Sequence, residues 1–233
     1  MKRRKLNIYL DGIPLKDIKN YKNKVDGFTF NPSLFKNLGV KNYLDFTKKV
    51  AKAAYPKSVS IEVIGDDEKT ILYQAKKLAK ISKNIFVKIP ITYTNGKSTY
   101  NLIKKLDEEK IKLNITAIFT LNQVKKIFPV VKNEKHILSI FAGRIFDIGI
   151  DAEKVFINTR KFLKSKKSNC KLLWASSRMV FDIFFAKRSD ADIITIPLPI
   201  YKKQKLFKIK PGKYSLETVR MFYKDAVKAK FKI

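Results

Sequence analysis

The sequence predicts an α/β protein, a single-domain (β/α)8 barrel of the TIM type with an extra helix at its C-terminus. Two observations support this fold class. Eight short apolar segments alternate with amphipathic segments along the 233 residues, as parallel strands alternate with the helices that connect them. No glycine-rich phosphate-binding turn follows the first apolar segment, and this disfavours the alternative, a doubly wound open sheet.

The apolar segments are short and rich in branched residues, which is typical of buried parallel strands. We predict strands at residues 7–11, 27–31, 58–64, 85–90, 113–119, 137–144, 171–176 and 192–197. Apolar residues at helical spacing predict helices at 43–54, 67–82, 99–109, 121–132, 152–164 and 179–188. A last amphipathic helix is predicted at 215–230, after a break at 210–212. Residues 1–233 are thus expected to form one domain, with 213–233 packing on their own barrel or on a neighbouring subunit.

The formal net charge of +31 raises the question of nucleic-acid binding. Most of the basic residues are lysines spread along the whole chain, and only seven are arginines, whereas phosphate and base recognition favours clustered arginines. We therefore expect a lysine-rich surface that attracts anionic metabolites, and no specific nucleic-acid partner.

The sequence also bears on location. No apolar run approaches the roughly 18 residues of a membrane-spanning helix, and the basic N-terminus is not followed by a signal-peptide core. The single cysteine, Cys170, cannot form an internal disulfide. We expect a cytoplasmic protein with no membrane partner.

One lysine is placed unusually. The segment from Ile85 to Ile91 is apolar except for Lys88, although nearly all other lysines fall on polar helical faces or in loops. A lysine buried among hydrocarbon is costly to charge, so its amine tends to be free near neutral pH. A free amine on a rigid strand is the nucleophile that a Schiff-base enzyme needs.

Further polar residues occur within or directly after the predicted strands, where catalytic groups of such barrels lie. They are Asp11, Thr29, Asn31, Glu62, Asn114, Thr116, Ser139, Arg144, Ser176 and Arg178, and Phe141 lies among them. Taken singly, Asp11 and Ser176 also fit helix N-caps, and Glu62 fits a solvent-facing position. Taken together, an Asp, a Glu and a Lys inside three apolar strands are not expected of a core that serves stability alone.

Arg144 and Arg178 stand out in a chain that mostly uses lysine. The planar guanidinium suits bidentate binding of phosphate, and Ser176, Ser177 and the following helix would add hydroxyl and amide donors. A surface ion pair is the alternative for either arginine.

Three residues are expected to be structural. His136, the only histidine, is predicted to lie on the surface in a polar loop at 132–136. Cys170 is predicted to be a small core residue. Trp174 is predicted to pack in the core, where its indole N–H would need a hydrogen-bond partner.

Seven short motifs occur in order across nearly the whole chain. They are Tyr9-Leu10-Asp11, Asp26-Gly27-Phe28-Thr29-Phe30-Asn31-Pro32-Ser33, Ser60-Ile61-Glu62-Val63, Val87-Lys88-Ile89-Pro90, Asn114-Ile115-Thr116, Phe141-Ala142-Gly143-Arg144 and Ala175-Ser176-Ser177-Arg178. In sequence and in order, these motifs resemble those of the transaldolase family. The resemblance is greatest to the short members, which include the fructose-6-phosphate aldolases.

The resemblance implies a role for each of these positions. It implies that Lys88 forms the Schiff base, that Asp11 is the acid/base for carbon–carbon cleavage, and that Glu62 and Thr116 hold a water for proton transfer. It further implies substrate contacts, through hydroxyl-orienting groups and a phosphate clamp, for Thr29, Asn31, Asn114, Ser139, Phe141, Arg144, Ser176 and Arg178. No metal or other cofactor is expected, because the iminium is the electrophile.

The implied reaction is the transfer of a dihydroxyacetone unit between phosphorylated ketoses and aldoses. Glu62 and Phe141 resemble the transferases, whereas the aldolase branch has glutamine and tyrosine there. An aldolase that releases dihydroxyacetone and a non-catalytic sugar-phosphate-binding barrel remain alternatives. The resemblance also implies a homo-oligomer, which in short members is a decamer. Gly12 and Phe30 depart from the family pattern and are expected to reshape the donor end of the pocket.

Overall fold

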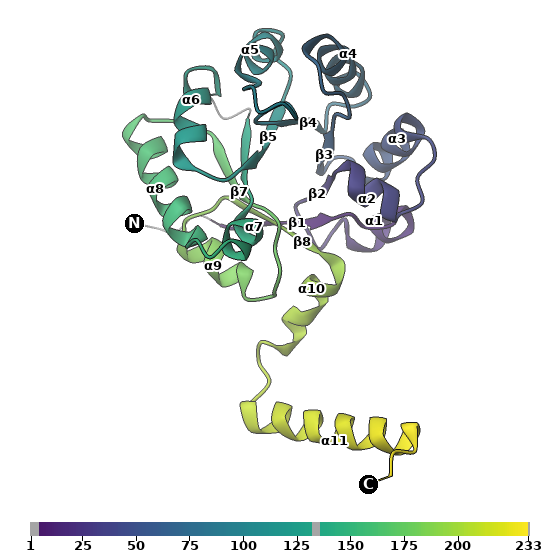
Figure 1. The fold of residues 1–233 in the computed structure, drawn as a ribbon. Coiled ribbons are helices and arrows are strands. Elements are labelled where there is room, and N and C mark those ends of the chain that lie inside the picture. Colours follow the sequence, from purple (N-terminus) through teal and green to yellow (C-terminus); the bar gives the residue numbers. More distant parts are fainter. Residues whose placement is uncertain (1–4, 132–135, 233) are drawn as a thin grey trace. The chain divides into compact units, whose positions relative to one another are not determined.

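The computed structural model describes residues 5–131 and 136–232. Within these residues, eight parallel strands form a closed barrel in which sequence neighbours pair and β8 pairs with β1 (Figure 1). The strands are β1 (Asn7–Asp11), β2 (Gly27–Phe30), β3 (Ser58–Glu62), β4 (Ile85–Pro90), β5 (Leu113–Ile118), β6 (Ile137–Ile140), β7 (Lys171–Trp174) and β8 (Ile193–Pro197). The predicted fold class is confirmed.

Helices surround the barrel in Figure 1 and connect its strands. These helices are α1 (Leu15–Tyr21), α2 (Pro32–Asn37), α3 (Tyr43–Ala54), α4 (Glu68–Ala79), α5 (Tyr100–Glu108), α6 (Leu121–Val131), α7 (Ala142–Asp147), α8 (Ala152–Ser165) and α9 (Asp182–Arg188). A further helix, α10 (Leu198–Lys202), follows the last strand. Asn42, Asp67 and Asp151 each cap the N-terminus of the helix that follows, with a side-chain oxygen accepting a backbone N–H. These caps satisfy donors that an α-helix leaves unpaired at its first turn.

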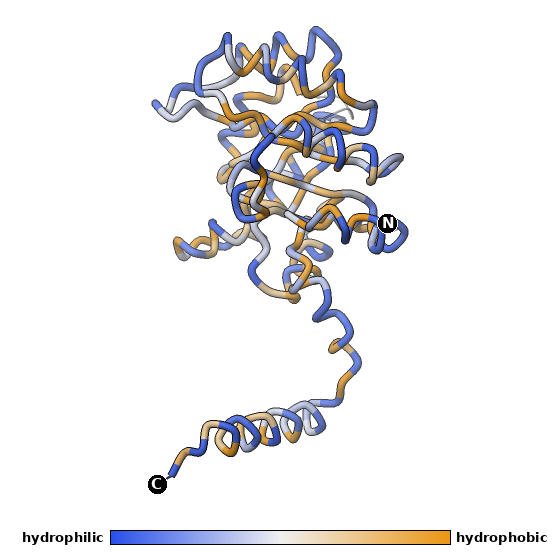
Figure 2. Tube along the Cα trace, turned by 90° about the vertical axis from the view of Figure 1, so that its right-hand side faces the viewer, coloured by the Kyte–Doolittle hydropathy of each residue, from blue (hydrophilic) through white to orange (hydrophobic). Residues whose placement is uncertain are grey.

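The chain divides into two compact units, one ending at Tyr201 and one beginning at Lys202. The second unit contains a short 3-10 helix (Lys203–Leu206) and α11 (Pro211–Ala229). Hydrophobic and hydrophilic residues alternate along α11 in Figure 2. Among the described residues, no helix is long and apolar enough to cross a membrane.

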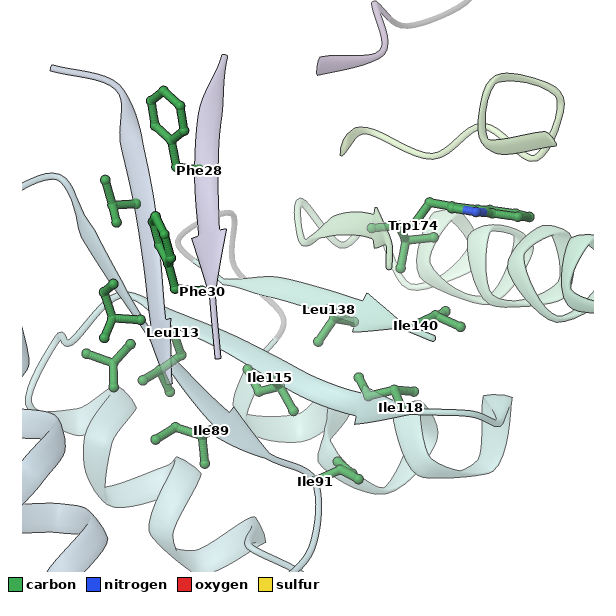
Figure 3. Close-up of a cluster of buried hydrophobic side chains, with 14 of the residues drawn as sticks. Phe28, Phe30, Ile89, Ile91, Leu113, Ile115, Ile118, Leu138, Ile140 and Trp174 are labelled. Carbon is green, nitrogen blue, oxygen red and sulfur yellow. The ribbon is translucent and has the colours of Figure 1, made fainter. Parts of the chain in front are cut away.

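The apolar core has two parts. The larger cluster lies between the outer face of the strands and the helices, and Figure 3 shows some of its members, including Phe30, Ile115 and Trp174. A smaller cluster contains Tyr9, Ile137, Leu173, Ala175 and Ile193. Side chains two apart on a strand share a face, so Tyr9 lies on the same face of β1 as Asp11. The smaller cluster therefore fills the interior of the barrel below its polar end.

Several predicted boundaries need correction. The strand predicted at 137–144 ends at Ile140, so Phe141 precedes α7 and Arg144 lies within it. The break predicted at 210–212 extends too far, because Lys210 is the extended N-cap and Pro211 already begins α11. A proline at the first helical position lacks only an N–H that would have no helical partner. Four short helices, α1, α2, α7 and α10, were not predicted.

The prediction for His136 is wrong. Its side chain is buried, with Nε2 2.6 Å from Asp107 Oδ1, and the Leu113 N–H donates to its Nδ1 at 3.3 Å. These contacts link α5 to the start of β5. Residues 132–135 of the predicted loop lie outside the described residues. Cys170 is buried, as predicted, and burial raises the pKa of its thiol to about 11.

Trp174 is buried in β7 and packs against Phe146, Phe156 and Phe185, as predicted. Its indole Nε1–H donates to Asp182 Oδ1 at 3.0 Å. The buried indole thus has the hydrogen-bond partner that it was expected to need.

Candidate active site

A cavity of about 230 Å³ lies at the carboxyl ends of the strands. Every predicted site residue except Glu62 lines it, namely Asp11, Thr29, Asn31, Lys88, Asn114, Thr116, Ser139, Phe141, Arg144, Ser176 and Arg178. The parallel pairing explains this convergence, because all eight strands point their carboxyl ends toward the same opening.

Lys88 is only 6% exposed and reaches this cavity from β4. Its Nζ lies 3.0 Å from Glu62 Oε2, because the strand register places Glu62 directly opposite Lys88. The sequence correctly predicted burial, but the purely hydrocarbon surroundings that it suggested are not found. Glu62 is an ionic partner that offsets the cost of burying an ammonium and is close enough to exchange a proton with it.

Asp11 lies at the end of β1 and accepts a hydrogen bond from the Thr29 hydroxyl at 2.6 Å. Burial raises the pKa of the Asp11 carboxyl, and Glu62 adds to this effect, while Lys88 and the Thr29 hydrogen bond act in the opposite direction. Asp11 is therefore a stronger base than an ordinary aspartate. It shares the cavity with Lys88, as a cleavage base must.

Asn114 belongs to a hydrogen-bonded row across three strands. Its Nδ2 donates to Ser60 at 3.0 Å, and its Oδ1 accepts from Ser139 at 2.6 Å. All three side chains are buried. Within the described part of the chain, the hydroxyl oxygen of Thr116 is buried and has no hydrogen-bond partner. It lines the cavity two residues after Asn114 and is available to a bound water or substrate.

Glu62 lines a second cavity of about 390 Å³, together with Tyr43 and other residues of α3 and α4. The Tyr43 hydroxyl donates to the backbone carbonyl of Glu62 at 2.5 Å. Burial and the Glu62 carboxylate raise the pKa of Tyr43, so Tyr43 is a neutral donor that holds the end of β3 in place.

The two arginines have different surroundings. Both are exposed and line the cavity, but Arg178 Nη2 also lies 2.6 Å from Asp147 Oδ2. The surface ion pair considered as an alternative is thus present for Arg178, beside its position at the cavity.

The loop after β7 is held close to α7. A Cβ on Gly143 would lie 1.8 Å from the carbonyl oxygen of Ser176, so only glycine allows this approach. Ser176 itself has a φ of 63°, in the region that non-glycine residues rarely adopt. Asp182 accepts the backbone N–H groups of Arg178 and Met179, at 2.7 and 2.9 Å.

Asn31 caps α2, its side chain accepting the Leu34 N–H at 2.8 Å. Because the cap uses the oxygen, the Asn31 amide N–H groups are what it can offer to a substrate. Leu34 lines the cavity and lies where a side chain on Gly12 would be, since a Cβ there would be 2.6 Å from Leu34 Cδ2.

Phe30, which we expected to reshape the pocket, is fully buried against Phe35 and Phe46, outside the barrel. That expectation is wrong for Phe30, because alternation along β2 turns it away from the face that carries Thr29.

The predicted site residues do not include Thr195, Ser60 or Asp182. Thr195 and Ser60 are hydroxyl residues on inward-facing strand positions and could have been found from the alternation along β8 and β3. Asp182 gave no such signal, because it lies in a helix and acts on a loop. Within the described residues, no group of three or more His, Cys, Asp or Glu side chains is placed to hold a metal ion.

Comparison with known proteins identifies the family of this chain. The family model described as "Transaldolase/Fructose-6-phosphate aldolase" matches residues 8–233. A protein of Bartonella henselae named "Probable transaldolase" is 31% identical over 199 residues, which are 84% of this chain and 88% of that protein. A protein of the same name from Methanococcus maripaludis is 30% identical over 200 residues, which are 85% and 89% of the two chains.

Solved structures with little sequence identity share the fold. Orotidine 5'-monophosphate decarboxylase of Sulfolobus solfataricus superposes with a TM-score of 0.52 at 16% identity, covering 96% of this chain and all of the other. Thiamine phosphate pyrophosphorylase of Pyrococcus furiosus superposes with a TM-score of 0.55 at 7% identity, covering 82% and 85%. These likenesses concern the barrel alone.

Proposed function

Because the chain belongs to the transaldolase/fructose-6-phosphate aldolase family, we propose that it transfers a dihydroxyacetone unit from a phosphorylated ketose to an aldose through a Schiff base on Lys88. The main support is the buried Lys88 amine, 3.0 Å from Glu62 and in the same cavity as Asp11. An amine, a proton acceptor within reach of it and a second carboxylate that shares its cavity are the groups that the reaction needs.

The reaction begins at Lys88. Glu62 takes a proton from the Lys88 ammonium, and the free amine attacks the ketone carbon of the donor. Loss of the carbonyl oxygen as water leaves an iminium between that carbon and Nζ. Thr116, whose hydroxyl is buried and unpaired in the described structure, is placed to hold this water, and Glu62 to supply the protons for its departure.

Carbon–carbon cleavage then involves Asp11. Its carboxylate removes the proton of the donor's C4 hydroxyl, the C3–C4 bond breaks, and the electron pair moves into the iminium to give an enamine. The raised pKa of Asp11 favours this proton abstraction. The aldehyde leaves, the enamine attacks an acceptor aldehyde, and hydrolysis of the new iminium releases the product ketose.

Phe141 supports transfer over release. It lines the cavity, and a phenyl ring has no hydroxyl to protonate the enamine and free dihydroxyacetone. The enamine therefore persists until an acceptor arrives. Arg144, Arg178 and Ser176 line the same cavity and would bind the phosphate of the substrate.

Incubation with fructose 6-phosphate, with and without erythrose 4-phosphate, tests the proposal. Turnover only with the acceptor supports transfer, whereas release of glyceraldehyde 3-phosphate without it supports the aldolase. Borohydride reduction in the presence of fructose 6-phosphate followed by mass spectrometry should locate a three-carbon adduct on Lys88. An unmodified wild-type protein would instead indicate a barrel that binds sugar phosphates without turnover.

We further propose that α11 packs on a neighbouring copy in a homo-oligomer. The residues Leu216, Val219, Tyr223 and Val227 lie on one side of α11 by their spacing. Within the described residues of its unit, only the short 3-10 helix accompanies α11, so another body must cover this side. Light scattering should give a mass of several chains for the wild type and a lower mass for Val219→Lys. A monomeric wild type would refute this proposal.

The expected cytoplasmic location stays a prediction.

A further inference from the structure

Thr195 on β8 extends the predicted site by one hydroxyl. Its oxygen lies 2.5 Å from the Thr29 hydroxyl oxygen, and Thr29 lies 2.6 Å from Asp11 Oδ1. Both threonines are buried, with 5% of Thr195 and 2% of Thr29 exposed. A chain of hydrogen bonds therefore runs from β8 through Thr29 on β2 to Asp11 on β1.

The direction of donation along these hydrogen bonds follows from the number of hydrogens that each group can donate. A threonine hydroxyl has one hydrogen to give and two lone pairs to accept with, whereas an ionised carboxylate only accepts. When Asp11 is ionised, Thr29 must use its hydrogen for Asp11. The contact between the two hydroxyls then requires Thr195 to donate to Thr29.

We propose that Thr195 is a positioning residue for the reaction, because its hydroxyl fixes the direction in which Thr29 donates to Asp11. The inference rests on the proposed role of Asp11 as the cleavage base. Without Thr195, the oxygen of Thr29 loses its donor, and the bond that stabilises the ionised carboxylate is weakened.

The three side chains lie on paired strands of the barrel. Asp11 is opposite Thr29 in the pairing of β1 with β2, and Thr195 lies two residues before Pro197, which is opposite Asp11 in the pairing of β1 with β8. The Ser177 hydroxyl also donates to the Thr195 carbonyl at 2.9 Å. Strand pairing therefore sets the backbone positions from which the three side chains meet.

The charged groups that act on Asp11 come from other strands. Lys88 on β4 favours the ionised carboxylate, and Glu62 on β3 opposes it. Replacement of Thr195 leaves both charges in place, so a change in the pH dependence of cleavage can be attributed to the hydroxyl chain.

The test compares Thr195→Val with the matched control Thr195→Ser, which keeps the hydroxyl and loses only a methyl group. We expect Thr195→Val to move the acidic limb of the pH profile of kcat upward by about 0.1–0.7 pH units, which corresponds to ~10–30% of the free energy of a charge-assisted hydrogen bond. Thr195→Ser should restore the wild-type limb. Thr195→Ala repeats the measurement if the valine variant does not fold.

A second cycle tests the path of the effect. Thr29→Val should move the limb by about 1–2 units, and adding Thr195→Val to that variant should cause no further shift, because Thr195 acts only through Thr29. The inference is overturned if the limb does not move in Thr195→Val, if serine fails to restore it, or if the two shifts add.

Borohydride trapping separates this inference from the proposed function. A Lys88 adduct in the wild type together with an unmoved limb in Thr195→Val refutes the role of Thr195 alone. The absence of an adduct in the wild type refutes the Schiff-base reaction itself.

Discussion

The ion pair between Arg178 and Asp147 leads to a prediction about phosphate binding. The two side chains are in contact at 2.6 Å, yet Arg178 lines the cavity in which the substrate phosphate is expected. If Arg178 binds that phosphate through Nη2, the phosphate must displace the Asp147 carboxylate from this nitrogen. The free energy of the ion pair then opposes phosphate binding. Asp147→Asn removes the ion pair and should therefore improve the affinity for phosphorylated substrates.

The exposure of the two partners sets the size of this effect. The side chains of Arg178 and Asp147 are 52% and 51% exposed, and pairs of this kind contribute about 0.2–1 kcal/mol because water and salt screen them. This free energy corresponds to an affinity change of about 1.4–5-fold. Arg178→Ala removes a charge-assisted bond to phosphate, and its exposure places the loss near the lower limit for such bonds, about 10-fold in kcat/KM.

The assay measures steady-state kinetics with fructose 6-phosphate and with unphosphorylated dihydroxyacetone. We expect Asp147→Asn to lower KM for fructose 6-phosphate, to leave kcat unchanged and to have no effect with dihydroxyacetone. In the double variant with Arg178→Ala, Asp147→Asn should have no effect. A higher KM in Asp147→Asn would show that Asp147 orients Arg178 for phosphate, and equal effects on both substrates would refute the phosphate site.

Three further outcomes are expected. Lys88→Met should abolish the borohydride-trapped adduct and lower the free energy of unfolding by up to about 3 kcal/mol, since Glu62 loses its partner. The double variant Lys88→Met/Glu62→Gln should recover this stability in urea unfolding. No recovery would contradict a stabilising ion pair between Lys88 and Glu62. Asp11→Asn should lower kcat about 10²–10⁴-fold but raise Tm at pH 7. The pKa of Asp11 is higher in the folded than in the unfolded state, so its ionisation costs stability above the folded pKa and costs nothing below the unfolded value of about 3.9. A Tm gain that persists at pH 3 would contradict this reasoning. Asp182→Ala leaves three N–H donors, including that of Trp174, without their acceptor and should lower the unfolding free energy by about 3 kcal/mol or more; a loss below about 1 kcal/mol would contradict it.

The fold was accessible from the sequence because a parallel barrel buries both faces of its strands. Short segments rich in branched apolar residues, such as those of β4 and β8, are a strong signal. Helices of nine or more residues, such as α3 and α8, show a clear period. The short helices α1, α2 and α7 have six or seven residues, so their periodic signal is weak. The strand predicted through Arg144 was therefore too long, because α7 follows β6 directly.

The candidate site could be predicted as far as the alternation of inward and outward side chains along each strand determines which residues face the cavity. Side chains such as Asp11, Thr29 and Asn114 face the cavity because inward and outward positions alternate along each strand. Contacts between strands were not accessible in this way. His136 was placed on the surface because its neighbours in the sequence are polar, whereas its position is decided by Asp107, 29 residues away.

The sequence by itself determined the barrel, the polar residues at the carboxyl ends of its strands and the lysine buried in β4, because each of these follows from the order of apolar and polar residues along one segment. Only the tertiary structure decided that Lys88 has a carboxylate partner, that Asp147 forms an ion pair with Arg178 and that hydrogen bonds connect Thr195 to Asp11 through Thr29. These pairings depend on strand register and loop packing, which bring together residues that no local pattern connects.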